Sequence, residues 1–362
     1  MLAWESAPTA GFNPPFRGSH VGVCTRRPTP RPHPTPSPIS EPHVRHSADR
    51  FPIRTIRRNP DHPLVPIANP LRKPVSRPGH RYLAGAPLLI AHRGGSGLAP
   101  ENTLAAFRRA VEWWRADLLE IDVQPSREGE AIVIHDPTVD RTTDGTGHVS
   151  THTVAELKQL DAGYRFTPDG GATFPYRGTG VRLGTLREVI EAFPQMRINV
   201  EIKDTRAQRS VWDAVHDLHA VHRVLIAAGD RNNRSRFRDY GGPRSAGSQD
   251  MYAFYGLHLA RATRLWTPTV DAFQMPERHG GRQILTPAML AQLHARNVAV
   301  HVWTVDDARD MRRLLEWGVD GVITDRPDRL ARILHQVHGR PLPPGPPPGE
   351  AEPWLERLLR AG

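Results

Sequence analysis

Two hydrophobic patterns alternate along the chain from about residue 87 to residue 338. Short apolar runs are typical of buried strands, and between them apolar residues recur at the spacing of one helix face. The clearest helical patterns cover 102–114, 207–222, 287–296 and 307–317. The predicted strands are PLLIAH (87–92), LLEIDV (118–123), RINVEI (197–202), RVLIAA (223–228), a weak segment at 244–248, DAFQM (271–275), VAVHVWTV (298–305) and DGVITD (320–325).

Eight strands with intervening helices predict an α/β protein built as a TIM-type (β/α)8 barrel, which takes about 250 residues. An open, doubly wound sheet is the competing architecture. Such a sheet often carries a G-x-G-x-x-G element at its first strand–helix turn, and this sequence has none there. The barrel is therefore the favoured prediction.

The segment from about 124 to 184 does not fit one strand–helix unit. Within it, AIVIHD (131–136) has the pattern of another strand, which we expect to return antiparallel beside 118–123. The remainder is rich in Thr, Gly and Asp. We predict a small inserted subdomain after the second strand, on the carboxyl-terminal face where the loops of such barrels bind and react.

Both ends of the chain are rich in proline. Residues 1–85 hold 17 of the 36 prolines and 13 Lys or Arg against four Asp or Glu, a local net charge of +9. Without apolar periodicity, this segment is predicted to be a disordered tail. The barrel domain is expected to cover 86–338. A second proline-rich tail, 339–362, ends in PWLERLLRAG, which has the pattern of a short amphipathic helix.

The distribution of charge narrows the possible partners. The whole chain has a net charge of +10, so the barrel domain itself is close to neutral and no nucleic acid partner is expected for it. The tail arginines could contact nucleic acid or anionic lipid, but a solvated tail explains them without a partner. The single cysteine, Cys24, allows no intrachain disulfide. With no signal-like start and no apolar run of about 18 residues, we expect a cytoplasmic protein without a transmembrane segment.

Carboxylates mark the ends of two predicted strands. Side chains alternate along a strand, so Glu120 and Asp122 point the same way, and so do Glu201 and Lys203. Carboxylates on one inward face repel each other unless a cation joins them. A simple Glu201–Lys203 ion pair is the alternative. The pattern favours a hard divalent cation bound by three carboxylates, which leaves Lys203 to meet an anionic substrate.

Two histidines directly follow predicted strands. IAHRGG places His92 and Arg93 after the first strand, and VIHD places His135 after the strand of the insertion. Histidine titrates near neutral pH, and the arginine fork suits phosphate oxygens. A lone histidine is more often structural, but two beside the acidic strand ends indicate general acid/base chemistry.

Together these segments resemble the glycerophosphodiester phosphodiesterase family. The resemblance extends over roughly residues 87 to 336, and its motifs occur in the family's order. The matching stretches are AHRGGSGLAPENTLAAF, LLEIDV, IVIHDPTVDRTTDGTG, LGTLREVI, NVEIK, HVWTVDD and GVDGVITDRP.

The resemblance implies a TIM-type barrel with an inserted subdomain, a Ca2+ or Mg2+ ion, and cleavage of a glycerophosphodiester into an alcohol and sn-glycerol 3-phosphate. It implies metal ligands at Glu120, Asp122 and Glu201, a general acid/base pair at His92 and His135, and substrate contacts from Arg93, Lys203 and Trp303. Glu101 would orient the groups of the site, unless it serves the helix start together with Asn102.

Two loops depart from the family pattern, PSREGEA after the second strand and IAAGDRNN after the fourth, so the substrate stays open. A related phosphodiesterase acting on lysophospholipids is one alternative. A catalytically silent protein that binds through its basic tail is another, although every expected catalytic residue is present.

Overall fold

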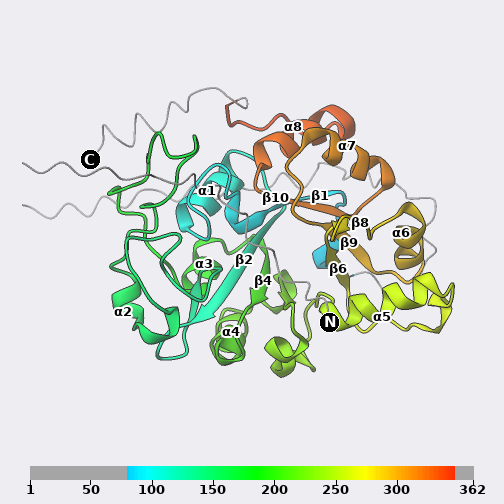
Figure 1. The fold of residues 1–362 in the computed structure, drawn as a ribbon, viewed down its shortest axis with the longest axis horizontal. Helices are drawn as coiled ribbons and strands as arrows, with labels where there is room; N and C mark the ends of the chain where they lie inside the picture. Colours follow the sequence, from blue (N-terminus) through cyan, green and yellow to red (C-terminus); the bar gives the residue numbers. More distant parts are fainter. Residues whose placement is uncertain (1–79, 347–362) are drawn as a thin grey trace, which may run out of the picture. The chain divides into compact units, whose positions relative to one another are not determined.

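The structure, a computed structural model, describes residues 80–346, so the predicted tail up to residue 79 and the helix predicted near the carboxyl terminus lie outside it. Its main sheet has the order β5-β4-β2-β1-β10-β9-β6, and neighbours along this path run parallel (Figure 1). The strands of this path are β1 Leu88–Ala91, β2 Leu118–Pro125, β4 Arg197–Ile202, β5 Val224–Ala227, β6 Ala272–Met275, β9 Ala299–Val302 and β10 Gly321–Thr324.

Single residue pairs join the two ends of this sheet. Arg244 pairs with Ile226 of β5, and Ser245 pairs with Ala272 of β6, both in parallel. The weak strand predicted at 244–248 is therefore reduced to two bridging residues, and they complete a ring of eight parallel segments. The predicted (β/α)8 barrel is confirmed.

Helices cover the outside of the ring (Figure 1). Several begin where a side chain accepts a hydrogen bond from the first turn, as Thr103 does for α1, Thr286 for α6 and Asp307 for α7. The predicted helix at 207–222 is shorter, since α4 ends at Asp217. The longer helices are α1 Leu104–Glu112, α3 Leu186–Ala192, α4 Gln208–Asp217, α5 Ser248–Leu259, α6 Pro287–His294, α7 Ala308–Trp317 and α8 Pro327–His338.

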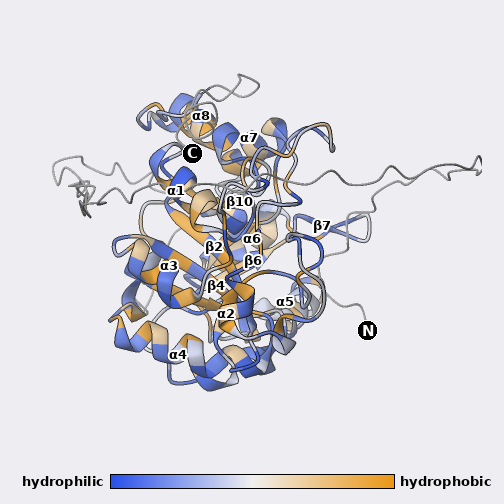
Figure 2. Cartoon of the chain, turned by 90° about the vertical axis from the view of Figure 1, so that its left-hand side faces the viewer, coloured by the Kyte–Doolittle hydropathy of each residue, from blue (hydrophilic) through white to orange (hydrophobic). Residues whose placement is uncertain are grey.

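Apolar side chains form two layers. The larger fills the space between strands and helices, and the smaller fills the inside of the barrel around Leu88, Ile90 and Leu118. Figure 2 shows the hydrophobic colour on the inner strands and mixed colours on helices such as α4. Tyr82 and Leu83 belong to the inner cluster and are 1% and 9% exposed. The folded part of the chain thus includes Arg81–Leu83, a few residues before the boundary predicted near residue 85, because these residues form a 3-10 turn that packs against the interior.

The segment after β2 has a small core of its own. The strand β3 (Ala131–Val133) pairs antiparallel with β2 through Val123 and Val133, as predicted. It is followed by the short helix α2 (Val154–Leu157). The buried residues of this cluster are Ile132, Ile134, Val139, Val149, Leu157, Ala162 and Leu183. This packing holds the loop that follows β3 at the carboxyl end of β2.

Candidate active site

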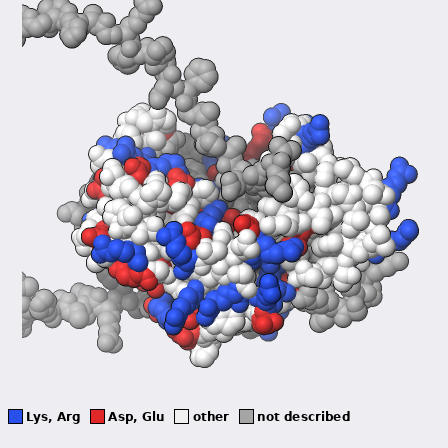
Figure 3. Space-filling view, turned by 60° about the horizontal axis from the view of Figure 1, so that its bottom comes forward, with Lys and Arg blue, Asp and Glu red and all other residues white. Residues whose placement is uncertain are grey.

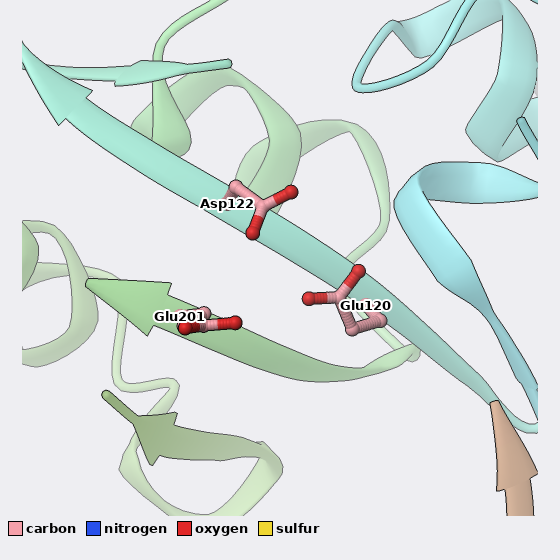
Figure 4. A group of neighbouring side chains, drawn as sticks. All are labelled: Glu120, Asp122 and Glu201. Atoms are coloured by element: carbon pink, nitrogen blue, oxygen red, sulfur yellow. The ribbon is translucent and has the colours of Figure 1, made fainter. Parts of the chain in front are cut away.

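Three carboxylates meet where β2 and β4 lie side by side (Figure 4). Asp122 is the register partner of Glu201, and Glu120 precedes Asp122 on the same strand face. One oxygen from each of the three lies within 4.8 Å of the others. Glu120 and Asp122 are 4% and 1% exposed. The structure thus brings together the three residues that the sequence singled out as metal ligands.

This donor set fits a hard cation. Calcium binds oxygens at about 2.3–2.6 Å, so two oxygens on one ion lie at most about 5 Å apart. Burial and the neighbouring Asp122 raise the pKa of Glu120 to about 8. That rise reflects the cost of holding a second buried anionic carboxylate beside the first, and a bound cation would remove it.

Two basic side chains surround Asp122. Lys203 Nζ lies 3.0 Å from Asp122 Oδ1 and 3.0 Å from Glu201 Oε2, and Arg93 Nε lies 3.2 Å from Asp122 Oδ2. Burial alone would raise the pKa of Asp122, but the charges of Lys203 and Arg93 hold it well below its usual range. Asp122 therefore stays ionised and holds both basic side chains at the cluster.

The turn after β1 adapts its backbone to the site. Arg93 has a φ of 51° and lies between His92 and two glycines with positive φ. In this conformation the Arg93 backbone N–H donates to Glu120 Oε2 at 3.0 Å. A Cβ on Gly94 would lie 2.8 Å from the Cβ of Ala106, so this position has no room for a side chain. The turn thus fixes both His92 and Glu120.

His92 is held by a carboxylate at the end of β10. Its Nδ1 lies 2.6 Å from Asp325 Oδ1. Burial alone would lower the pKa of His92, but the hydrogen bond to Asp325 and the charge of Glu120 raise it above the ordinary value. An ionised carboxylate can only accept, so Nδ1 carries the proton and Nε2 is the nitrogen left for chemistry.

His135 is held by a carboxylate in the same way. It lies at the mouth of the barrel, which is the opening at the carboxyl ends of the strands. Its Nδ1 lies 2.6 Å from Asp136 Oδ1. Arg141 Nε donates to the second oxygen of Asp136 at 2.6 Å, and the same guanidinium donates twice to Glu101, at 2.7 Å each. Glu101 in turn accepts from Arg93 at 3.0 Å. A continuous ionic network therefore joins His135 to Arg93.

Trp303 lines a cavity of about 390 Å3 beyond the carboxyl ends of β6 and β9. Asp306, in the wall of this cavity, accepts from the backbone N–H of Asp325 at 2.8 Å, so the cavity borders the His92 side of the mouth. His301, on the same strand face as Trp303, is fully buried, and burial lowers its pKa to about 4. The remaining lining residues are Pro276, Glu277, Arg278, Thr304, Val305, Asp307 and Asp310.

Comparison with known proteins assigns the chain to a family. The model of the glycerophosphoryl diester phosphodiesterase family matches residues 92–329. The chain belongs to this family. A glycerophosphodiester phosphodiesterase of Caldanaerobacter subterraneus subsp. tengcongensis is 35% identical over 69% of this chain and 98% of its own length. A probable glycerophosphodiester phosphodiesterase 2 of Mycobacterium tuberculosis is 30% identical over 69% of this chain and 91% of its own.

Solved structures of the glycerophosphoryl diester phosphodiesterase family share the fold. Such a domain of an uncharacterized Mycobacterium tuberculosis protein superposes with a TM-score of 0.62, at 21% identity, over 69% of this chain and 99% of that one. An Oleispira antarctica phosphodiesterase, solved with the product sn-glycerol-3-phosphate, gives a TM-score of 0.55 at 25% identity, over 68% and 96% of the two chains. The protein is thus an enzyme, a hydrolase of phosphoric diesters.

Three residues that the sequence did not point to lie beside the predicted site residues. Asn102 was considered for the start of a helix, but its φ is 58° and its amide donates to Asp122 at 3.1 Å, while Thr103 caps α1. Asp325 and Arg141 were not singled out. Their signal was present in the stretches ITDRP and VDRTT, directly after a strand end and within the insertion.

Proposed function

We propose that the protein hydrolyses glycerophosphodiesters to an alcohol and sn-glycerol 3-phosphate, with a divalent cation and histidine acid/base catalysis. The observation that carries the proposal is the cluster of Glu120, Asp122 and Glu201 at the mouth of the barrel. The activity in the name of the Caldanaerobacter relative and the product held by the Oleispira phosphodiesterase support the substrate class.

The basic side chains bind the phosphodiester. A divalent cation on the three carboxylates would stabilise the negative charge that develops on the phosphate oxygens. Lys203 and Arg93 are held beside the same carboxylates, at 3.0 and 3.2 Å from Asp122. They add positive charge to this position and orient the phosphate, with the Arg93 fork presenting parallel donors.

The two histidines move the protons. Because Asp325 and Asp136 occupy Nδ1 of His92 and His135, Nε2 of each ring exchanges a proton with the substrate. One histidine takes the proton of the attacking hydroxyl, from water or from the neighbouring glycerol hydroxyl. The other gives a proton to the oxygen of the departing alcohol. Attack by the glycerol hydroxyl forms a cyclic phosphate, which water then opens.

The cavity beside Trp303 favours a water-soluble substrate over a lysophospholipid. Its wall carries Glu277, Asp306, Asp307 and Asp310. An acyl chain would have to lie against these carboxylates and strip them of water at a high cost in free energy. A small polar alcohol can keep them hydrated, which supports deacylated glycerophosphodiesters as substrates.

The test is hydrolysis of sn-glycero-3-phosphocholine and sn-glycero-3-phosphoethanolamine, with glycerol 3-phosphate detected by a coupled dehydrogenase. Wild type is assayed with Ca2+, with Mg2+ and with EDTA, beside Glu120→Ala and the exposed control Glu112→Ala. Loss of the cation removes several kcal/mol of charge stabilisation, so EDTA and Glu120→Ala should each lower the rate by about 10³-fold or more. EDTA-resistant turnover would refute the metal role, and release only from acylated substrates would refute the substrate class.

A further inference from the structure

The outer face of α5 is apolar, whereas the outer faces of α4 and α7 expose charged residues. From residue 252 to the residue that caps the end of the helix, Ala260, the exposed residues are Tyr252, Ala253, Gly256, Leu259 and Ala260. By contrast, α7 exposes Arg309 and Glu316. A helix that is apolar on its inner and its outer face is normally covered on both. The outer face of α5 therefore differs from the charged outer faces of α4 and α7.

The chain that follows α5 extends this surface. The 3-10 turn Thr263–Leu265 contacts α5 and ends in Leu265, which is 71% exposed, beside the 66% exposed Leu259. Arg261 and Arg264 are exposed between these two leucines. The stretch 251–266 contains no Asp or Glu. In Figure 3 the region over α5, on the right, is white with blue at its edge and without red.

From these features we infer that the α5 surface, formed by Tyr252, Leu259, Arg261, Arg264 and Leu265, docks on an anionic lipid bilayer. Exposed leucines with arginines around them match the two layers of such a membrane, acyl chains inside and negative headgroups outside. Tyr255 and Trp266, half-buried beside the leucines, have the amphipathic rings that gather at the headgroup level.

Charge argues against other occupants of this surface. In a two-fold dimer the patch would meet itself, and its arginines would face arginines with no acid from 251–266 between them. Residues 1–79 are also basic, with 12 Lys or Arg against four Asp or Glu, and would be repelled. Gly345, near the end of the described residues, donates its backbone N–H to Trp113 at the end of α1, on the far side of the ring from α5 (Figure 1).

The position of the surface leaves the active site open. The helix α5 carries the chain from Ser245 back toward the start of β6, so Leu259 and Leu265 lie toward the amino ends of the strands. The carboxylate cluster lies toward the carboxyl ends. Docking through this surface therefore does not cover the mouth of the barrel. Among the described residues, no helix is long and apolar enough to cross a membrane.

The experiment is co-sedimentation of the full chain with vesicles of phosphatidylcholine alone or with an equal part of phosphatidylglycerol, at low and at high salt. The variant Leu259→Ser/Leu265→Ser removes the apolar contact, and Arg261→Gln/Arg264→Gln removes the charges. The matched control is Val337→Ser/Leu342→Ser. It replaces two apolar residues outside the α5 surface that are 47% and 56% exposed.

We expect wild type and control to bind the anionic vesicles alike. The leucine variant should partition at least about tenfold less, because binding scales with buried apolar area. The arginine variant should lose about fivefold per charge, on anionic vesicles only. Equal binding by the leucine variant and wild type, or no binding by wild type, overturns the inference. So does a wild-type dimer in sedimentation equilibrium that the leucine variant converts to monomer. Absence of glycerophosphodiester hydrolysis would not affect the vesicle-binding result, since the inference does not rest on the proposed reaction.

Discussion

The mouth of the barrel removes charged groups from water, whereas the outer face of α5 exposes apolar side chains to water. At the mouth, two carboxylates of the cluster are buried, and Asp122 is held by Lys203, Arg93 and Asn102. On α5, the apolar side chains of Leu259 and Leu265 are exposed. A buried charge that loses its partner costs far more than an exposed leucine that is replaced. We therefore expect substitutions at the mouth to change catalysis, and substitutions on α5 to change membrane contact alone.

The largest expected effect at the mouth comes from the histidines. His92→Ala and His135→Ala should each lower kcat by about 10²–10⁴-fold, the usual contribution of a general acid or base. Steady-state kinetics on sn-glycero-3-phosphocholine measures the effect. His219→Ala, at an exposed position after α4, is the control. Turnover near the wild-type rate in a folded His92→Ala or His135→Ala variant would remove that residue from the mechanism.

A smaller effect is expected when His92 keeps its ring but loses its carboxylate. Asp325 raises the pKa of His92, so Asp325→Asn should lower that pKa. The limb of the pH–rate profile that reports His92 then moves to lower pH, and kcat falls by about tenfold or more because the ring is no longer held in one tautomer. Profiles of kcat against pH for wild type, Asp325→Asn and the surface control Asp213→Asn decide this. An unshifted limb in Asp325→Asn would show that the carboxylate does not act through His92.

Arg141 tests how strongly the inserted segment supports the site. Its guanidinium joins Asp136 to Glu101, so Arg141→Ala leaves Asp136 held only by His135 and Glu101 only by Arg93. We expect kcat to fall about tenfold with little change in KM, because the positions of His135 and Arg93 loosen while binding persists. Arg141→Lys keeps the charge but not the fork, and should recover only part of the rate. Equal kcat values for wild type, Arg141→Ala and Arg141→Lys would show that the ionic network does not contribute to catalysis.

The smallest effect on catalysis belongs to the α5 surface. Leu259→Ser/Leu265→Ser should leave kcat and KM at wild-type values, and shift the free energy of unfolding by less than about 0.5 kcal/mol per site, as exposed substitutions do. Denaturant unfolding together with the soluble assay measures both. A loss of activity in solution would show that the α5 surface affects catalysis at the mouth, and would contradict the independence of the two regions.

Local rules in the sequence predict the frame of the barrel and the core of the site. Apolar runs located the strands, and the two-residue period placed Glu120 and Asp122 on one face without further information. Neighbouring parallel strands then brought Glu201 to the same edge. The family resemblance supplied the roles, which remain proposals, whereas the family itself and its hydrolase class are confirmed.

Partners from distant segments were beyond these rules. Asp325 reaches His92 across 233 positions of sequence, and Arg141 reaches Glu101 across 40. Such pairs depend on which loops meet in three dimensions, and no periodicity encodes that. The choice of Thr103 over Asn102 as the cap was also decided by tertiary structure, because Asn102 turns its amide to Asp122.

The way the ring closes has a mechanical consequence. Neighbouring strands share between two and six register pairs along the main path, but the junction at Arg244 and Ser245 has one pair on each side. Among the described strands, this seam has the fewest register pairs, so we expect local opening of the barrel to begin there. It lies across the ring from the turn that carries His92. Opening at the seam is therefore expected to leave the spacing between His92 and the carboxylate cluster unchanged.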